Sequence, residues 1–530
     1  MRHVIALGRR AVLAGSAASL TVLSAPPAAR AARPPLLERG LPARARLRDP
    51  FTLGVASGDP EPDGVVLWTR LAPQPLAWDG LGGMPSREVR VDWQVATDAQ
   101  FTQVVRQGSV RALPRRAHAV HVEVAGLEPG REYFYRFRAE GHLSPVGRTR
   151  TAPAYDSSPA SFTVAAASCA EYEHGYFTAY RRLAEDDPDL VLHLGDYLYE
   201  FRHNGYVASP HNVRRTVGPE TVTLAGYRQR HAQYKTDPDL QLAHAAAPWS
   251  VVWDDHEVDG NWAGLDPAHH QHDFRRRRMA AFQAYYENMP LRRSSMPRGA
   301  GMQIYRRVRW GDLATVHLLD TRQYRDDQAC GDRRTSRCRA RLDPDRSITG
   351  DRQERWLLRG LGNSDARWDV IAQQVFFAQH DTSRRPGRQV GMDAWDGYAA
   401  SRQRILEGFV HRGVRNPVVL TGDVHRHYAN ELRLDFDRPA TRPIGVELVT
   451  TSVTSGGNGS DTTPAMRAER AVNPHIRYSS SRRGYLLTRY TRSSLQADFK
   501  VLPYVRRAGA PARTDASYVV EDGDPRLEQA

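Results

Sequence analysis

The sequence predicts an α/β fold preceded by a small all-β domain, and three observations support this prediction. After residue 160, short apolar segments of strand length alternate with helical or long polar segments. Before residue 152, segments of alternating polar and apolar residues are separated by turn residues. Between the two patterns, residues 150–161 are rich in proline, serine and alanine, as expected of a connection. The 530 residues, 40% of them hydrophobic, suffice for two domains.

Residues 1–31 are predicted to be an export signal and no part of either domain. A basic start leads into an apolar run over residues 11–25, and Ala29-Arg30-Ala31 fits a small-residue cleavage site. Arg9 and Arg10 match a twin-arginine signal, which the twin-arginine export machinery reads on folded proteins. A chance pair of arginines is the alternative. No later segment reaches the roughly 18 to 20 apolar residues of a membrane span, so we expect a periplasmic or extracellular protein.

Residues 48–152 are predicted to form a β-sandwich. Residues 88–95, 118–126 and 131–139 alternate in polarity. The stretch from Leu127 to Tyr133 looks like the corner before a late strand in fibronectin-like sandwiches. No catalytic cluster is found in this domain, so we expect the chemistry to lie in residues 160–510.

The formal net charge of +14 comes almost entirely from arginine, since Lys235 and Lys500 are the only lysines. One interpretation is a solvated arginine-rich surface, and the other is attraction of anionic substrates. No basic run is interleaved with aromatic residues, so a nucleic-acid groove is not expected.

The three cysteines are an odd number for an exported chain. Cys330 and Cys338 lie close together in a polar loop, where a disulfide can form. Cys169 is left over at the carboxyl end of an apolar strand. A lone thiol is commonly a small buried hydrophobe, but ligand positions also occur at such strand ends.

Four apolar strands after residue 160 end in residues of related chemistry. Carboxyl ends of strands in an α/β sheet border one crevice, so side chains that are distant in sequence can meet there. Buried carboxylates repel one another unless cations are bound, and carboxylate, imidazole, thiolate and phenolate groups together indicate a metal site. Each motif alone is weak, because such residues also occur in turns, on surfaces or in packing. The four strand ends are Ser168-Cys169, Gly195-Asp196-Tyr197-Leu198-Tyr199, Trp253-Asp254-Asp255-His256-Glu257 and Thr421-Gly422-Asp423-Val424-His425.

These four motifs, in this order, resemble the metallophosphoesterase superfamily, and within it the PhoD-like alkaline phosphatases. The resemblance covers roughly residues 48–505 and includes the β-rich domain and the twin-arginine signal. It implies a metallophosphoesterase-type α/β sandwich, in which two mixed sheets are flanked by helices. One departure is Asp259-Gly260-Asn261 after the third motif, where paired asparagines are expected.

The resemblance also implies the metal ions and their ligands. Fe(III) is expected at Cys169, Asp196, Tyr199 and His425, with Asp196 bridging to one or two Ca(II) ions. Calcium prefers hard oxygen ligands, for which Asp255, Asp423 and either Gln374 or Asn261 are expected. His256 matches a histidine near the phosphoryl group and is expected to donate a hydrogen bond or proton to the leaving oxygen. The alternative is that His256 only orients a metal ligand.

The expected function is that of an exported phosphatase acting on phosphomonoesters and phosphodiesters at alkaline pH, as a monomer, for phosphate scavenging. A noncatalytic surface-binding protein with a structural metal site is the alternative. Structural metal sites are closed, whereas this mixture of ligands suits an exchangeable position, which favours the enzyme.

Overall fold

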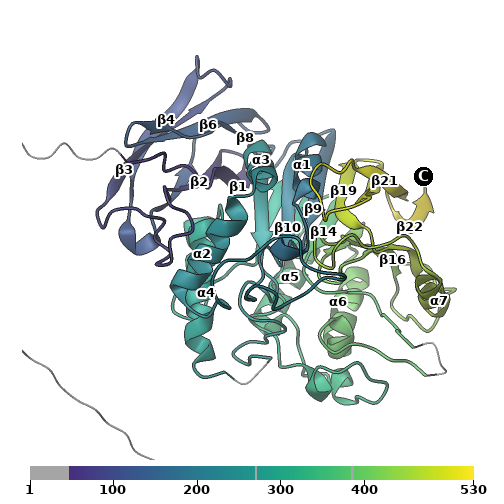
Figure 1. Ribbon diagram of the computed structural model, residues 1–530. Helices are drawn as coiled ribbons and strands as arrows, with labels where there is room; N and C mark the ends of the chain where they lie inside the picture. Colours follow the sequence, from purple (N-terminus) through teal and green to yellow (C-terminus); the bar gives the residue numbers. More distant parts are fainter. Residues whose placement is uncertain (1–46, 269–270, 384–386) are drawn as a thin grey trace, which may run out of the picture. The chain divides into compact units, whose positions relative to one another are not determined.

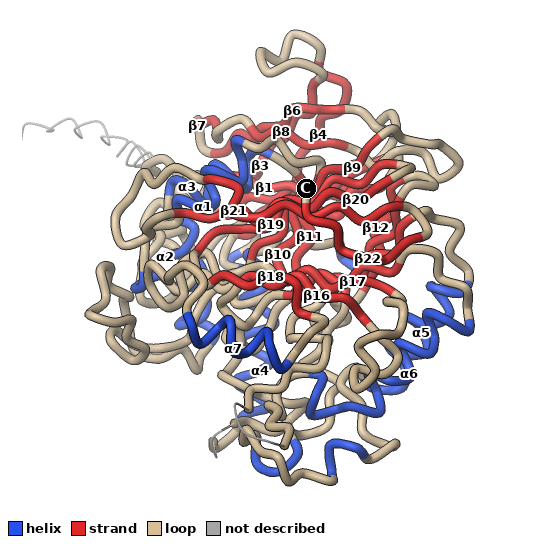
Figure 2. Tube along the Cα trace, turned by 90° about the vertical axis from the view of Figure 1, so that its right-hand side faces the viewer, coloured by secondary structure: helices blue, strands red, loops and turns tan. Residues whose placement is uncertain are grey.

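Two β-sheets lie at the centre of the molecule with helices around them, as Figure 2 shows for the computed structural model of the chain. The structure describes residues 47–268, 271–383 and 387–530, so the predicted export signal lies outside the described residues. Both sheets are mixed. The ten-stranded sheet has the order β22 (Asp524–Gln529), β21 (Arg513–Glu521), β20 (Ser494–Leu502), β19 (Arg483–Thr491), β9 (Ser161–Ala167), β10 (Leu190–Leu194), β11 (Pro248–Val252), β1 (Val55–Glu61), β2 (Gly64–Arg70) and β5 (Ala119–Val124).

The second sheet has seven strands, and its centre is parallel. Every residue of β10, β11, β14 and β15 is buried, as expected of parallel strands that are covered on both faces. The strand order is β12 (Arg306–Trp310), β13 (Ala314–Leu318), β14 (Trp368–Ala372), β15 (Pro417–Thr421), β17 (Gly445–Val449), β16 (His427–Leu432) and β18 (Ile476–Ser480).

The two sheets share one hydrophobic core. Val164 and Leu192 of the ten-stranded sheet belong to the same cluster of buried residues as Val370 and Leu420 of the seven-stranded sheet. A second cluster places Leu357 of α5 with other residues against the opposite face of the seven-stranded sheet. The helices around the sheets are α1 (Thr178–Glu185), α2 (Leu224–Lys235), α3 (Pro238–Ala246), α4 (Phe274–Asn288), α5 (Gly350–Gly362), α6 (Ala399–His411) and α7 (Pro464–Val472).

Local sequence explains where several helices begin. Asp237 precedes α3, and its carboxylate accepts hydrogen bonds from the amides of Asp239 and Leu240, while Pro238 occupies the first turn, where a missing amide hydrogen costs nothing. The hydroxyl of Thr223 accepts a hydrogen bond from the amide of Gly226 at the start of α2 in the same way. These caps fix the starts of the two helices that connect β10 to β11.

The amino-terminal β-rich region is a sandwich, visible at the upper left of Figure 1. Val91 and Phe137 of its outer sheet pack with Leu67 and Val122 of the ten-stranded sheet in one cluster. β1 pairs in parallel with β11, so the inner sheet of the sandwich continues into the larger sheet. The outer sheet consists of β4 (Val104–Ala112), β3 (Val89–Ala96), β6 (Glu132–Ala139) and β7 (His142–Leu143), and β8 (Gly147–Arg150) pairs with β6.

The predicted fold class is confirmed: two mixed sheets with helices on their outer faces follow a β-sandwich. At the carboxyl end, β21 and β22 extend the ten-stranded sheet beyond residue 510, the limit predicted for the catalytic domain. The described chain from Leu47 onward forms one compact unit, because backbone pairing between β1 and β11 joins the sandwich to the rest.

Candidate metal centre

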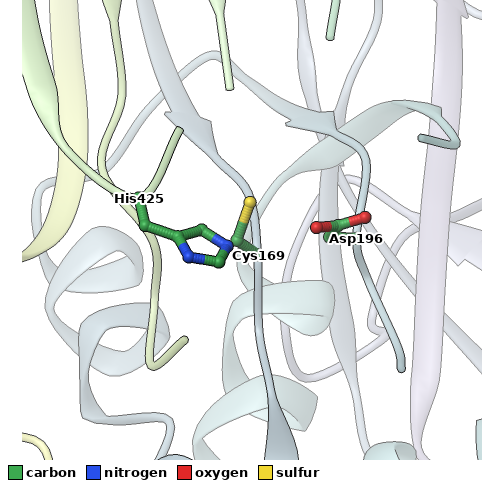
Figure 3. Close-up of side chains that lie close together, drawn as sticks. All are labelled: Cys169, Asp196 and His425. Atoms are coloured by element: carbon green, nitrogen blue, oxygen red, sulfur yellow. The ribbon is translucent and has the colours of Figure 1, made fainter. Parts of the chain in front are cut away.

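The four predicted strand ends meet between the two sheets. β9, β10 and β11 are parallel neighbours, so the residues that follow them emerge at one edge of the ten-stranded sheet. β15 of the seven-stranded sheet ends at Thr421 and brings Asp423 and His425 to the same place. Figure 3 shows Cys169, Asp196 and His425 together, each from a different strand end.

Three overlapping groups of side chains can hold metal ions. In each group, one potential ligand atom per residue lies within 4.8 Å of the others. Asp196 and Asp255 each belong to two groups, so the three groups form one continuous cluster. The groups are Cys169, Asp196 and His425; Asp196, Asp255 and His256; and Asp254, Asp255 and Asp423.

The backbone is strained where it presents these side chains. Five of the predicted ligand residues have positive φ angles, a region that non-glycine residues rarely occupy. Such strain persists only where the surrounding structure enforces it, and it concentrates at functional sites. The φ angles are 58° at Cys169, 54° at Asp196, 53° at Asn261, 64° at Asp423 and 55° at His425.

The structure separates the two tyrosines of the second motif. The Tyr199 hydroxyl lies 2.9 Å from Asp196 Oδ2 and 3.1 Å from His425 Nε2. The Tyr197 hydroxyl instead lies 2.9 Å from His244 Nε2, away from the cluster. Residues two apart in an extended segment point the same way, but the chain bends at Tyr197 and Leu198, so the two tyrosines diverge.

The electrostatics of the cluster fit bound cations. Burial, and then the charge of Asp255, raise the pKa of Asp196 well above its usual range. Burial and Asp254 do the same to the pKa of Asp423. Asp254 Oδ2 and Asp255 Oδ1 are buried and accept no hydrogen bond from the described residues. Carboxylates crowded and unsatisfied in this way are stabilised in ionised form by metal ions, so the residues present suit a metal centre.

His256, a member of the second group, lies at the wall of a large cleft. Its ring stacks on Tyr199 with centroids 4.1 Å apart, and its Nδ1 lies 2.8 Å from Glu200 Oε2. Burial opposes the charged imidazole, but Asp255, Glu200 and Asp196 outweigh this and raise the pKa of His256 well above its usual value. The cleft has a volume of about 2070 Å³ and is lined by His256, Asp255 and Asn261 among others.

The two further calcium ligands expected from the sequence differ in their surroundings. The side-chain amide of Asn261 donates through Nδ2 to Asp332 Oδ2 at 2.6 Å. Its backbone amide donates to Asp255 Oδ2 at 2.7 Å, so Asn261 borders the cluster. Gln374 Oε1 instead accepts from both the amide and the hydroxyl of Thr321, at 3.0 and 2.6 Å. These bonds use both lone pairs of Oε1. The Gln374 backbone carbonyl also accepts from the amide of Gly422 at 2.8 Å, next to Asp423, and Gln374 stays a predicted ligand.

The expected cysteine pairing is present. Cys330 and Cys338 form a disulfide, and Cys169 is free and buried. The disulfide-closed loop contains Asp332, which bonds to Asn261 at the cleft.

Three residues that support the cluster were not predicted as site residues. Glu257 accepts hydrogen bonds from the amides of Asp196, Tyr197 and Asp254, and thereby joins two metal-binding loops. Glu200 orients His256. Arg322 is buried and pairs with Asp254 and Asp393. Glu257 ends the third motif, Glu200 directly follows the second, and Arg322 follows β13, so the same positional rule could have found all three.

An open cluster of candidate metal ligands between two sheets, facing a wide cleft, is typical of metal-dependent hydrolases. The model of the PhoD-like phosphatase family matches residues 162–499, and the model of its amino-terminal domain matches residues 37–153. The chain is 49% identical over 482 residues to alkaline phosphatase D of Bacillus subtilis (strain 168). The matched region covers 91% of this chain and 82% of that protein.

A solved structure described as PhoD matches with a TM-score of 0.89 and 48% identity, over 91% of this chain and 92% of that one. The chain therefore belongs to the PhoD-like phosphatase family, and it is a phosphoric ester hydrolase. The predicted resemblance is confirmed, and the alternative of a noncatalytic binding protein is set aside. Among the described residues, no helix is long and apolar enough to cross a membrane.

Proposed function

We propose that the protein hydrolyses phosphomonoesters and phosphodiesters at alkaline pH, outside the cytoplasm, and that it supplies phosphate to the cell. The observation that carries this proposal is the continuity of the cluster, in which Asp196 and Asp255 each belong to two ligand groups. Shared carboxylates allow metal ions to lie close enough together to act on one phosphoryl group.

The hardness or softness of the ligand atoms indicates which metal ion suits each group of side chains. Cys169, Tyr199 and His425, together with Asp196, supply the thiolate, phenolate and imidazole that suit Fe(III). Asp254, Asp255 and Asp423 supply only carboxylate oxygens, which suit Ca(II), and Asn261 borders this group. Asp196 belongs to the thiol group and also to the group with Asp255 and His256, so its carboxylate lies between the two kinds of ligand and would serve ions at both ends.

When bound, the ions would supply positive charge to the phosphoryl oxygens and lower the pKa of the attacking water. The chain's own contribution to the leaving group is His256. His256 Nδ1 is hydrogen-bonded to Glu200. The other ring nitrogen, Nε2, therefore points toward Asp255, and it lies 3.8 Å from Asp255 Oδ2. A protonated His256 can donate its Nε2 proton to the ester oxygen as the phosphorus–oxygen bond breaks.

The alternative for His256 is that it only orients Asp255 or Tyr199, which it also contacts. A series of esters decides between the two roles. If His256 donates the proton, His256→Asn should slow esters with poor leaving groups more than the activated p-nitrophenyl ester. Equal losses for all esters would assign His256 to orientation alone.

The width of the cleft favours esters with one or two organic groups. At about 2070 Å³, it leaves room beyond a phosphoryl group for a second substituent. The test is turnover of p-nitrophenyl phosphate and of bis(p-nitrophenyl) phosphate by the metal-loaded protein across pH. Failure on both esters would overturn the proposal, and activity on one would set the preference.

Export by the twin-arginine machinery is part of the proposal and rests on Arg9, Arg10 and the cleavage site at residues 29–31. Replacing both arginines by lysine should keep the precursor in the cytoplasm, as cell fractionation would show. The expected monomer can be checked by light scattering on the mature protein.

A further inference from the structure

The segment that follows the second motif has no helix or strand of its own, yet it is held firmly at one residue. Residues 201–216 leave the metal centre at Glu200 and are irregular throughout. Glu173 is 1% exposed and accepts hydrogen bonds through its carboxylate from four donors of this segment. The donors are His203 Nδ1, the Asn204 amide at 2.8 Å, Asn212 Nδ2 at 2.7 Å and the Thr216 amide at 2.7 Å.

The residue that this anchoring positions is Tyr206. Asn212 Nδ2, which also bonds Glu173, donates to the carbonyl of Tyr206 at 2.9 Å. The Tyr206 ring packs edge-on against His174, with centroids 4.6 Å apart, and the amide of Gly456 donates to His174 Nδ1 at 2.9 Å. Tyr206 is therefore fixed from two sides, although it lies in an irregular loop.

The Tyr206 hydroxyl has no hydrogen-bond partner in the described parts of the chain, in contrast to Tyr199. Its ring lies 6.1 Å from the Tyr199 ring and 5.8 Å from the Phe201 ring, which in turn lies 5.3 Å from His256. Burial raises the pKa of Tyr206, and the charged groups that act on it include His256, Asp196 and Cys169. The Tyr206 ring thus lies beside the Tyr199 ring near the candidate metal centre, and its hydroxyl is a donor without a partner among the described residues.

We infer that Tyr206 is a substrate-binding residue whose hydroxyl donates a hydrogen bond to the phosphoryl group, and that Glu173 is the residue that positions it. This inference rests on the proposed function, because the phosphoryl group must lie over the metal cluster. A fixed, unpartnered donor beside that cluster matches an oxyanion that arrives only with substrate or product.

The first test is the affinity of the metal-loaded protein for inorganic phosphate, measured by titration calorimetry. Tyr206→Phe keeps the ring against His174 and removes the donor, so phosphate affinity should fall about 10- to 100-fold, as for other hydrogen bonds to charged groups. Tyr155→Phe is the matched control, since Tyr155 is 52% exposed and its ring packs against Arg309 rather than against a residue of the candidate metal centre. Unchanged phosphate affinity in Tyr206→Phe would overturn the assignment.

The second test separates positioning from contact. Glutamine at position 173 offers one acceptor oxygen to four donors, so Glu173→Gln should accelerate amide hydrogen exchange at Asn204 and Thr216 and weaken phosphate binding. In the double variant, Tyr206→Phe should then add little, because the tyrosine is already displaced. Fully additive losses, or exchange as slow as in the native protein, would contradict the role of Glu173.

The two proposals fail in different ways. If the native protein binds phosphate but hydrolyses neither test ester, the proposed function fails. The role of Tyr206 is then still tested by comparing the phosphate affinities of the native protein and Tyr206→Phe. If the native protein hydrolyses esters and Tyr206→Phe binds phosphate normally, only the Tyr206 inference fails.

Discussion

The two ends of the candidate metal cluster differ in donor chemistry, although one loop, after β15, contributes to both. One end has the thiol of Cys169, the imidazole of His425 and the phenol of Tyr199. The other end has only the carboxylates of Asp254, Asp255 and Asp423. Each end takes residues from both sheets, since the loop after β15 sends Asp423 to one end and His425 to the other.

This difference shows that one backbone arrangement can present two classes of metal site. Asp423 and His425 are two residues apart, and both have positive φ angles, so a tight turn distributes them between the ends. The identity of each side chain then sets whether a soft or a hard ion is preferred. The ends should therefore respond differently to substitution and to chelation, which the following predictions test.

The largest effect is expected from Cys169→Ala at the sulfur end. Loss of the only thiol ligand should remove iron and lower turnover by at least about 100- to 1000-fold, the cost of losing a main source of transition-state charge stabilisation. Metal analysis and p-nitrophenyl phosphate assays check both. A variant that retained iron and activity would show that Cys169 is only packing.

Chelation should affect the carboxylate end first. EGTA treatment is expected to abolish activity, and Ca²⁺ but not Mg²⁺ alone should restore it, because the irregular oxygen cage suits the larger ion. Iron should stay bound throughout, as metal analysis would show. Activity that survived exhaustive chelation would count against calcium at Asp254, Asp255 and Asp423.

Tyr199→Phe should change the colour of the protein. An Fe(III) phenolate absorbs visible light by charge transfer, so the native protein should be coloured and this variant bleached. Tyr197→Phe is the matched control, because Tyr197 bonds to His244 and should leave the band unchanged. Bleaching by Tyr197→Phe would instead assign Tyr197 as the iron ligand. A native protein that is colourless, active and free of iron would rule out a phenolate ligand.

The smallest effect is expected from Cys330→Ala, beside the carboxylate end. Opening the loop should cost about 2 to 3 kcal/mol of stability, measured by denaturant unfolding. Iron content and turnover should remain, since neither cysteine of the disulfide belongs to a ligand group. Loss of iron in this variant would show that iron binding at the sulfur end depends on the loop that carries Asp332, beside the carboxylate end.

Much of the candidate site could be predicted from local sequence. Cys169, Asp196, Asp255 and His425 each follow a short apolar strand, and carboxyl ends of neighbouring parallel strands meet at one edge. Gln374 looked equally suitable by residue type and position. Its side chain bonds Thr321, a contact between the segments that follow β13 and β14, which no local pattern indicates.

The supporting residues show the same limit. Glu173 lies about 30 residues before the loop that it anchors, and the sequence around it has no feature that marks a buried carboxylate with four donors. Such a partnership depends on how loops pack over the finished sheets, because side-chain hydrogen bonds between distant segments form only when tertiary structure brings them together.

The sequence by itself determined the alternation of strands and helices, the β-rich start and the kinds of chemistry at the strand ends, because these depend on periodicity and on residue type. Only the tertiary structure decided which tyrosine joins the cluster, that Asn261 bonds Asp255 while the Gln374 side chain bonds Thr321, and that Tyr206 packs beside Tyr199. Those choices rest on the positive φ angles at Asp196 and Asp423 and on the docking of two sheets over one core, which fix directions in space that no stretch of sequence specifies alone.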